Sequence, residues 1–306
     1  MSSPIIVFGS INMDLVVYSD KQPAEGETIL GNSFDTFQGG KGANQAVAVS
    51  RLGIPVSLIG KVGTDVFGDE LLENLNNEQV DTSMVARYEG SSGVAFIYVF
   101  EETSENHIIV ISGSNELVQS SQISEKELSA SDILISQLEI PPSEIEDLFI
   151  RAKKSGIYKI LNTAPALKIS KNLIRETDLL VMNESELENL TERTLERQNA
   201  DSIGQAIKDL NLSTTQSVVV TLGSKGAYVY VDQKGQLIEG CKVKAVDTTG
   251  SGDCFIGALA SQYLESKDLL DSVNFANKAA ALSVMKKGAS ASMPSMEEVV
   301  NFHQIT

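Results

Sequence analysis

The 306-residue sequence is poor in cysteine, in histidine and in positive charge, and each scarcity excludes a class of protein. Two cysteines, Cys241 and Cys254, are too few for a disulfide framework or a zinc site. The two histidines, His107 and His303, lack the partners that a catalytic triad or a metal site needs. The net charge of −17 argues against binding to nucleic acid or to an anionic membrane, because either surface needs clustered Lys and Arg.

Long apolar stretches are absent as well. No run approaches the roughly 20 residues of a membrane-spanning helix, and residues 1–5 have neither the basic nor the long apolar region of a signal peptide. We therefore expect a cytoplasmic protein. The 42% of apolar residues suffices for a large core, which at this length favours a single domain spanning 1–306.

Short β-branched runs alternate with amphipathic stretches along most of the chain. This pattern is typical of α/β proteins in which crossover βα units surround a mostly parallel sheet. The predicted buried strands are 5–8, 56–59, 133–136, 157–161, 179–182 and 218–222. The predicted helices are 43–52, 67–76, 142–155, 184–190, 203–210, 252–264 and 272–285.

Two regions break the alternation. Residues 15–18 with 28–37, and residues 94–100 with 107–111, are predicted as strands joined by polar turns without crossover helices. If they pair, they form a small antiparallel sheet, a discontinuous lid from about 12–38 and 91–111. Alternation in 94–100 separates Phe96 and Tyr98 from Ala95 and Ile97 but does not tell which face is inward.

The segment Asp247–Phe255 is the most informative of the chain. A glycine-rich turn between a predicted strand, 241–246, and a predicted helix would aim the N–H groups of Ser251, Gly252 and Asp253 at one point, where the helix dipole adds to them. Such a point attracts an anion. A carboxylate beside it, Asp253, is suited to take a proton from a hydroxyl that attacks a phosphoryl group. An ordinary turn with an aspartate near a helix N-terminus has the same composition.

A second glycine turn, 38–46, enters a helix through Lys41 and Asn44. It differs from a Walker A loop, which requires Gly where this chain has Asp35 and Ser or Thr where it has Gly42. Its glycines allow the backbone to approach a small polar ligand, and Lys41 and Asn44 offer donors. A purely structural turn is the alternative.

Polar residues also follow several buried strands, at the edge of the sheet where open α/β folds bind ligands. Asn12 and Asp14 have the spacing to chelate neighbouring sugar hydroxyls, although an Asx turn would also explain them. Glu139 ends another strand. Asn183 and Glu186 lie at a strand-to-helix junction, where the carboxylate would orient waters around Mg²⁺ on nucleotide phosphates or would complete a capping box.

In this order, the segments resemble the ribokinase and phosphofructokinase-B family of sugar kinases. The resemblance runs from about Ile5 to Pro294 and rests on the motifs 9–14, 39–45, 137–139, 162–165 and 247–253. It implies a three-layer α/β/α core with a β lid and ATP-dependent phosphorylation of D-ribose at the 5-hydroxyl. Fructose, 2-keto-3-deoxygluconate, adenosine and pseudouridine remain alternative substrates. A non-catalytic binding protein remains the alternative from another class, whereas a dinucleotide-dependent oxidoreductase would need a G-x-G-x-x-G turn that is missing after the first strand.

The resemblance also implies roles for single residues. Asp253 would be the base, and Gly250, Ser251 and Gly252 would form the backbone anion hole. The implied sugar ligands are Asn12, Asp14, Gly39, Gly40, Lys41, Asn44, Glu139 and Asp253. The implied ATP site consists of Asn183, Thr221, Leu222, Gly223, Ser224, Lys225, Gly226, Gly252 and Asn277.

Two cations follow from the same resemblance, and a partner follows from the lid, because an exposed apolar sheet is a liability unless it is paired. Glu186 would act on Mg²⁺ through water. The monovalent site, expected to prefer K⁺, would consist of Asp247, Thr249, Ser283, Lys286, Gly288 and Ser292, several of them through main-chain carbonyls. The resemblance places Ala95 and Ile97 inward, against a compact sugar. Val94, Phe96 and Tyr98 would then face the lid of a second copy in a homodimer. The chain has Ser251 where the family usually has Ala.

Overall fold

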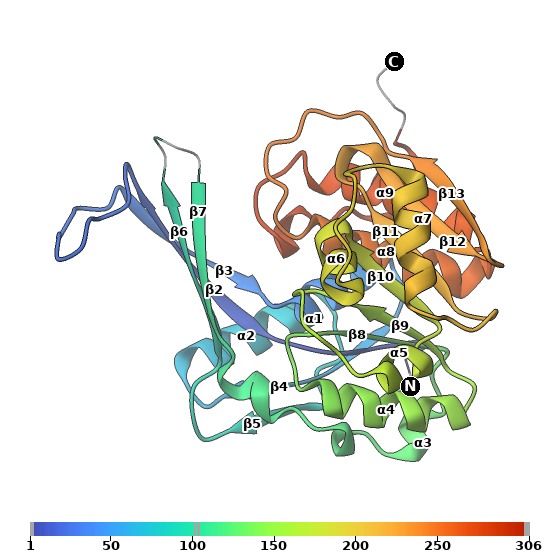
Figure 1. Ribbon diagram of the computed structural model, residues 1–306. Coiled ribbons are helices and arrows are strands. Elements are labelled where there is room, and N and C mark those ends of the chain that lie inside the picture. Colours follow the sequence, from blue (N-terminus) through green and yellow to red (C-terminus); the bar gives the residue numbers. More distant parts are fainter. Residues whose placement is uncertain (1–2, 101, 103–104, 303–306) are drawn as a thin grey trace.

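A nine-stranded sheet forms the centre of the computed structural model, which describes residues 3–100, 102 and 105–302. His303 and part of the 91–111 lid region lie outside the described residues. The strands of this sheet are β1 (Ile5–Phe8), β4 (Val56–Gly63), β5 (Val85–Tyr88), β8 (Ile133–Gln137), β9 (Tyr158–Asn162), β10 (Leu179–Asn183), β11 (Ser217–Thr221), β12 (Gly226–Val231) and β13 (Lys234–Glu239). Their order is β13-β12-β11-β10-β9-β8-β1-β4-β5, parallel from β11 to β5 and antiparallel at β12 and β13 (Figure 1).

Helices cover both faces of this sheet. They are α1 (Lys41–Arg51), α2 (Val66–Asn77), α3 (Glu125–Leu128), α4 (Pro142–Lys154), α5 (Lys171–Glu176), α6 (Glu184–Thr191), α7 (Ala200–Asp209), α8 (Ser251–Ser266), α9 (Leu269–Ser283) and α10 (Met296–Val300). Alternate residues of β1 enter two apolar clusters. Ile5 and Val7 pack with residues of α1, α2, α8 and α9, whereas Ile6 and Phe8 pack with α4 to α7. The predicted three-layer α/β/α core is therefore confirmed. Each fully buried Leu or Ile in it adds about 1.5–3 kcal/mol to the stability of the fold.

The prediction of a strand at 241–246 is wrong. The hairpin ends at Glu239, and Gly240 lies so close to Gly226 that the chain turns away from the sheet edge there. Beyond it, the N–H groups of Val246 and Asp247 donate to the carbonyl of Val284, at 2.7 and 3.1 Å. Cys241, Val243 and Ala245 of this segment therefore line a pocket and do not pair with a neighbouring strand. The predicted buried strands and helices elsewhere are confirmed, with ends shifted by a few residues.

A second sheet projects from the body as a lid (Figure 1). It consists of β2 (Asn12–Ser19), β3 (Ser33–Gly39), β6 (Gly93–Phe100) and β7 (Glu105–Ile111), in the order β3-β2-β6-β7. The hairpin pairs β2–β3 and β6–β7 are antiparallel, as predicted, while the central pair β2–β6 is parallel. The central pair is parallel because the first strand of each hairpin, β2 and β6, leaves the body in the same direction.

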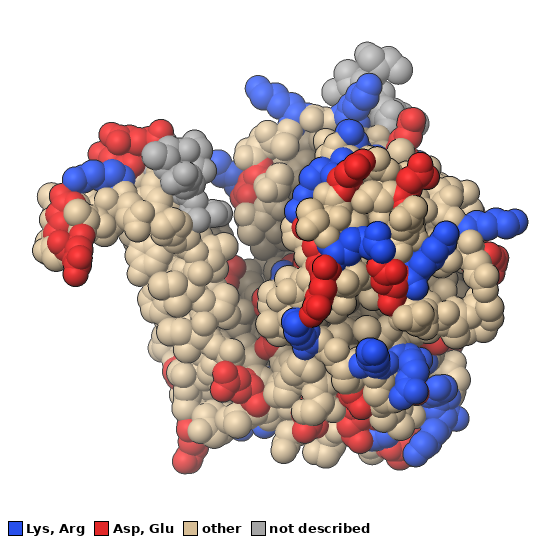
Figure 2. All heavy atoms as spheres, in the orientation of Figure 1, with Lys and Arg blue, Asp and Glu red and all other residues tan. Residues whose placement is uncertain are grey.

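The register of the lid decides which face is inward. Asp14 pairs with Ala95, which pairs with Val110, and directly paired residues share a face of a sheet. Asp14 faces the body, as the site below shows, so Ala95 and Ile97 lie on the inner face. The outer face carries Phe34, Tyr98 and Ile109, which are 57%, 36% and 56% exposed. Figure 2 shows the hollow that separates the lid from the body. Within the described residues, no helix combines the length and the hydropathy of a membrane crossing.

Candidate active site

The N-terminus of α1 lies at the carboxyl edge of the sheet. Gly40 precedes it with φ of 87°, and a Cβ at this position would lie 2.7 Å from the backbone nitrogen of Asn12, so glycine is required. Gly40 has no side chain to cap the helix. Glu139 replaces the cap, because one of its oxygens accepts the Lys41 N–H at 3.0 Å and the Ser10 hydroxyl at 2.5 Å.

Asp253 lies buried in the first turn of α8 and faces α1. Its two oxygens accept hydrogen bonds from the side-chain amides of Asn44, at 3.0 Å, and of Gln45, at 2.9 Å. The helices approach this closely at Gly257, one turn along α8, where a Cβ would lie 2.5 Å from Ala48. A small residue four positions after Asp253 therefore brings the carboxylate to the first turn of α1.

The turn before α8 offers open backbone donors. Gly250 caps the helix with φ of 72°, and within the described part of the chain the N–H groups of Gly250, Gly252 and Asp253 have no hydrogen-bond acceptor. Ser251 differs from the expectation. Its N–H and its hydroxyl both donate to the Thr248 carbonyl, at 3.2 and 2.8 Å, because the chain closes a tight turn there. The hole therefore has its open donors at 250, 252 and 253, and the Ser251 side chain stays within the turn.

The charges of four carboxylates act on the ammonium group of Lys41. Burial lowers the pKa of Lys41, but the charges of Asp253, Glu139, Glu186 and Asp14 together raise it above its ordinary value. Lys41 therefore stays protonated. One cation does not balance four carboxylates, so negative charge is in excess at this edge of the sheet.

The excess of negative charge adds to burial in raising the pKa values of three of these carboxyl groups. Burial first, then the charges of Glu139 and Asp253, raise the pKa of Asp14 to about 7. Burial also raises the pKa of Asp253, against the opposing effects of Lys41, Gln45 and Asn44. The pKa of Glu186 is raised for the same main reason. Groups whose pKa values shift together in a cleft mark a candidate functional site.

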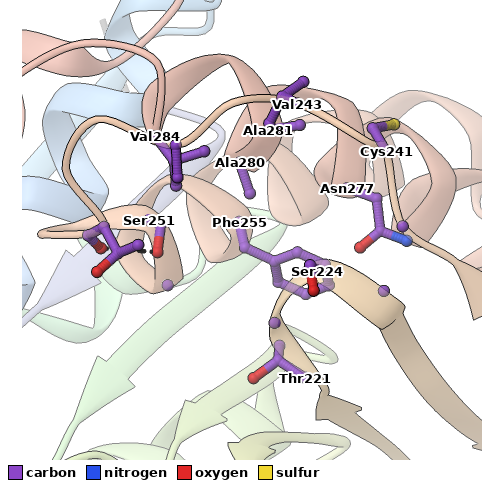
Figure 3. Close-up of a pocket in the computed structure, with 16 residues that line it drawn as sticks. Thr221, Ser224, Cys241, Val243, Ser251, Phe255, Asn277, Ala280, Ala281 and Val284 are labelled. Atoms are coloured by element: carbon purple, nitrogen blue, oxygen red, sulfur yellow. Dashed lines mark hydrogen bonds between the residues drawn. The ribbon is translucent and has the colours of Figure 1, made fainter. Parts of the chain in front are cut away.

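A pocket of about 280 Å³ opens between β11, β12, α8 and α9 (Figure 3). The predicted nucleotide residues Thr221, Gly223, Ser224, Gly226, Gly252 and Asn277 line it. Leu222 instead packs in the core, and Lys225 is exposed outside the lining. The apolar walls of this pocket were not predicted; they consist of Val243, Ala245, Phe255, Ala280 and Val284. No motif marks these residues, since apolar side chains on helices and extended segments are typical of any core.

A smaller cavity of about 150 Å³ shares Thr221 and Gly252 with this pocket. Lys41, Asn183, Glu186 and Asp253 also line it, so predicted sugar and nucleotide residues meet there. Asn183 and Glu186 form a capping box at the start of α6, with both backbone bonds at 2.9 Å. The structural role that the sequence allowed for this pair is therefore present, and the Glu186 carboxylate still borders the cavity.

On the lid side, a cavity of about 370 Å³ is bordered by Asn12, Val110, Asn115 and Glu139. Asn115 was not predicted. It lies in the 3₁₀ turn Gly113–Leu117 and donates its amide to the side-chain oxygen of Asn12 at 2.6 Å, which leaves the Asn12 amide group to face a ligand. Asp14 packs directly against Gly39, where a Cβ would lie 2.3 Å from its carboxylate.

The residues predicted to hold a monovalent cation come from two neighbouring loops. The Asp247 carboxylate accepts the N–H groups of Thr249 and Gly288, both at 2.9 Å, and these bonds lower its pKa although burial opposes them. Ser283 and Ser292 are buried nearby, and each hydroxyl donates to a carbonyl of its own turn. The Lys286 ammonium instead pairs with Glu298 on the surface. Among the described residues, no three His, Cys, Asp or Glu side chains gather closely enough to hold a metal ion.

Comparisons of sequence and of structure both relate the chain to carbohydrate kinases. Residues 3–296 match the model described as "pfkB family carbohydrate kinase". The chain is 43% identical to a ribokinase of Schizosaccharomyces pombe, over 96% of each protein, and 36% identical to a deoxyribokinase of Salmonella typhi, again over 96% of each. It is also similar to the structure of Arabidopsis thaliana ribokinase complexed with ribose and ATP, with 31% identity, a TM-score of 0.90 and coverage of 99% and 100% of the two chains.

Proposed function

Because the chain belongs to the pfkB family of carbohydrate kinases, we propose that it transfers the terminal phosphoryl group of ATP to the 5-hydroxyl of D-ribose, giving D-ribose 5-phosphate and ADP. One observation carries the proposal: a buried carboxylate, Asp253, lies beside open backbone N–H groups at a helix N-terminus. The ribokinase relatives support ribose as the sugar, and the Arabidopsis complex supports ribose with ATP. A reaction that consumes ATP is consistent with a cytoplasmic protein.

The sugar would lie between the lid and the body. Asn12, Asp14, Gly39, Gly40, Lys41 and Glu139 would surround its hydroxyls. Asn44 adds an acceptor, because its amide nitrogen bonds Asp253 and its buried oxygen has no partner in the described part of the structure. A sugar hydroxyl would satisfy that oxygen.

Phosphoryl transfer would proceed at the N-terminus of α8. Asp253 takes the proton of the 5-hydroxyl while the sugar oxygen forms a bond to the γ-phosphorus, and the bond from that phosphorus to the ADP oxygen breaks. The N–H groups of Gly250 and Gly252 stabilise the phosphoryl oxygens. Lys41 adds a positive charge beside the same cavity. The apolar pocket behind Thr221 and Asn277 would hold the adenine.

Two cations complete the proposal. Mg²⁺ bound to the phosphates would neutralise part of their charge, and the buried Glu186 carboxylate at the edge of the cavity is placed to accept from its waters. A monovalent cation, K⁺ by preference, would be held by carbonyls of the loops that the Asp247 carboxylate ties together. It would fix the loop that carries the anion hole without touching substrate.

A coupled ADP-release assay tests the activity directly. The panel is ribose, deoxyribose, fructose, 2-keto-3-deoxygluconate, adenosine and pseudouridine, each with and without K⁺. We expect the highest kcat/KM with ribose. Preference for another sugar would reassign the substrate, and binding without turnover on the whole panel would favour a non-catalytic binding protein.

Deoxyribose is the second candidate, because a deoxyribokinase is among the relatives. On β6, the inner face of the lid carries Ala95 and Ile97, whose small aliphatic side chains suit either compact sugar, and Phe37 of β3 lies on the same face beside Asp14. Comparable kcat/KM for ribose and deoxyribose would show that the 2-hydroxyl is not recognised.

The lid also supports a proposed homodimer. Its outer face exposes Phe34, Tyr98 and Ile109, and an exposed apolar sheet is stabilised when a second sheet covers it. Two lids clasped about a two-fold axis would bury these side chains. Light scattering at micromolar concentration should give twice the chain mass, and Ile109→Lys should shift it toward the monomer. A fully active monomer would contradict the clasp.

A further inference from the structure

Two glutamines form a buried chain behind Asp253. Gln45 and Gln137 are both 0% exposed. The Gln45 amide nitrogen donates to Oδ1 of Asp253 at 2.9 Å and to the Asn162 side chain at 3.3 Å, while its oxygen accepts the amide of Gln137 at 2.6 Å. The proposed reaction uses neither glutamine.

The Asp253 carboxylate determines which end of each of these two side-chain amides donates and which accepts. An ionised carboxylate only accepts hydrogen bonds, so Gln45 must present its NH₂ group to Asp253. Its oxygen then needs a donor, which Gln137 supplies. The Gln137 oxygen is left buried without a partner among the described residues, against Gly9, where a Cβ would lie 2.1 Å away.

An unsatisfied buried acceptor costs about 1–3 kcal/mol. The hydrogen-bonded series Gln137–Gln45–Asp253 therefore does not stabilise the fold at Gln137, whose oxygen has no donor within the described residues. Its effect is to hold the Asp253 carboxylate. Asn44 holds the other oxygen of Asp253, at 3.0 Å. With one amide on each oxygen, the plane of the carboxylate is fixed, and each oxygen keeps a lone pair for another donor.

We propose that Gln45 is a positioning residue for the base, which orients Asp253 and favours its ionised form, and that Gln137 holds Gln45 in the required orientation. The inference rests on the proposed phosphoryl transfer. Gln45 touches no reacting atom and acts only through the carboxylate.

The charges that face Asp253 set the background for any test by pH. They are Lys41 from α1, Asp14 from the lid, Glu139 after β8 and Glu186 from α6. Removing Gln45 changes none of these charges. It removes one hydrogen bond to the ionised form, so Asp253 should bind its proton more tightly, and the acid limb of the rate profile should move to higher pH.

The experiment compares Gln45→Leu, Gln45→Glu and Gln137→Leu with the wild-type protein, using steady-state phosphorylation of ribose from pH 5.5 to 9. For Gln45→Leu we expect kcat at pH 7 to fall by about 10- to 100-fold, the acid limb to move up by about one unit, and the KM for ribose to change less than about threefold. Gln45→Glu should move the limb further, because two carboxylates then share the site. Gln137→Leu should have the same sign and a smaller size.

Gln216→Leu is the matched control. Gln216 is also buried, and its amide group bonds the carbonyls of Ile174 and Thr177 and the N–H of Ser213, at the opposite edge of the sheet. Its loss should lower stability and leave the pH profile unchanged. If Gln45→Leu behaves like this control, or raises the KM for ribose with kcat intact, the positioning role is overturned.

A second readout separates this inference from the proposed activity. Carboxyl ¹³C NMR, with the Asp253 signal assigned by its absence from Asp253→Asn, follows ionisation without turnover. We expect Asp253 to titrate at higher pH in Gln45→Leu than in wild type. Equal titration midpoints would overturn the inference, even if the wild-type protein phosphorylates ribose. A wild-type protein inactive on every sugar would refute the proposed function alone.

Discussion

The two edges of the central sheet each bury charge, and they treat it differently. At the amino edge, Lys159 in β9 pairs with Asp178 at 2.5 Å and also donates to the Ile157 carbonyl, so a single cation meets a single carboxylate. At the carboxyl edge, Lys41 faces Asp14, Glu139, Glu186 and Asp253. Charge is balanced where the sheet only has to hold together. It is unbalanced where β2, α1 and α8 meet.

An unbalanced group of buried charges can therefore mark a binding site. A buried carboxylate surplus is unfavourable in the free protein, because burial and like charges raise the pKa values there. Protons, a cation, or sugar hydroxyls that donate hydrogen bonds would relieve it. The surplus thus predicts ligands that carry protons, positive charge or hydroxyl groups, and the following substitutions test the contrast between the edges.

The largest effect is expected from Asp253→Asn at the carboxyl edge. The amide cannot accept the proton of the 5-hydroxyl, so kcat with ribose should fall by at least ~10²-fold while ATP affinity changes little. Steady-state kinetics and calorimetric titration of ATP measure the two quantities. Asp268→Asn, at the N-cap of α9 and away from the site, is the control and should keep full activity. Retained turnover in Asp253→Asn would refute the assignment of the base.

At the amino edge, Lys159→Met should destabilise the fold by about 2 kcal/mol, because Asp178 loses its cation but is a third exposed and keeps the Lys159 backbone N–H as a donor. Urea unfolding gives this value. Adding Asp178→Asn should recover part of the loss, and kcat should stay within about twofold of wild type in both variants. A large change in kcat would show that the two edges are coupled.

Asp14→Asn should have the opposite effect on stability. The pKa of Asp14 in the folded protein is about 7, above its ordinary value of 3.8. The stability that its proton provides is present below the ordinary value and is lost as pH rises toward 7. A neutral Asn avoids that loss, so the stabilisation by Asp14→Asn at pH 8 should exceed that at pH 5.5 by about 2 kcal/mol.

The same variant should bind ribose far more weakly and ATP about as well, since Asp14 lies on the inner face of the lid. Urea unfolding at the two pH values and calorimetry with each ligand measure the two effects. Equal losses for ribose and ATP would show that Asp14 is structural. Asp201→Asn, in the exposed first turn of α7, should leave both affinities unchanged.

The smallest effect is expected from exchanging K⁺ for Na⁺, about fivefold in kcat, or about 1 kcal/mol. Carbonyl ligands favour a large, weakly hydrated cation. Rates at constant ionic strength in buffers that contain only one of the cations measure this effect. Equal rates in the two buffers would contradict the proposed preference for K⁺ over Na⁺.

Much of the fold was predictable, because buried parallel strands such as β1 and β10 are short apolar runs with clear ends. The segment 241–246 alternates apolar and charged residues as a half-buried strand would, yet it lies along a pocket, since periodicity records burial and not the partner that causes it. Around the site, glycine turns and strand-end polar residues indicated Asp253, Lys41 and Asn12. Tertiary contacts such as the Asn115 bond to Asn12 leave no local pattern.

Four short segments connect the lid to the body, because each of its two hairpins both leaves the body and returns to it. The β2–β3 hairpin is connected through residues 9–11 and Gly40, and the β6–β7 hairpin through residues 89–92 and Ser112 (Figure 1). The pairing of β2 with β6 joins the two hairpins into one sheet, so moving one hairpin without the other would break the hydrogen bonds between these strands. We therefore expect the lid to move as one unit, with its bending confined to the four connecting segments.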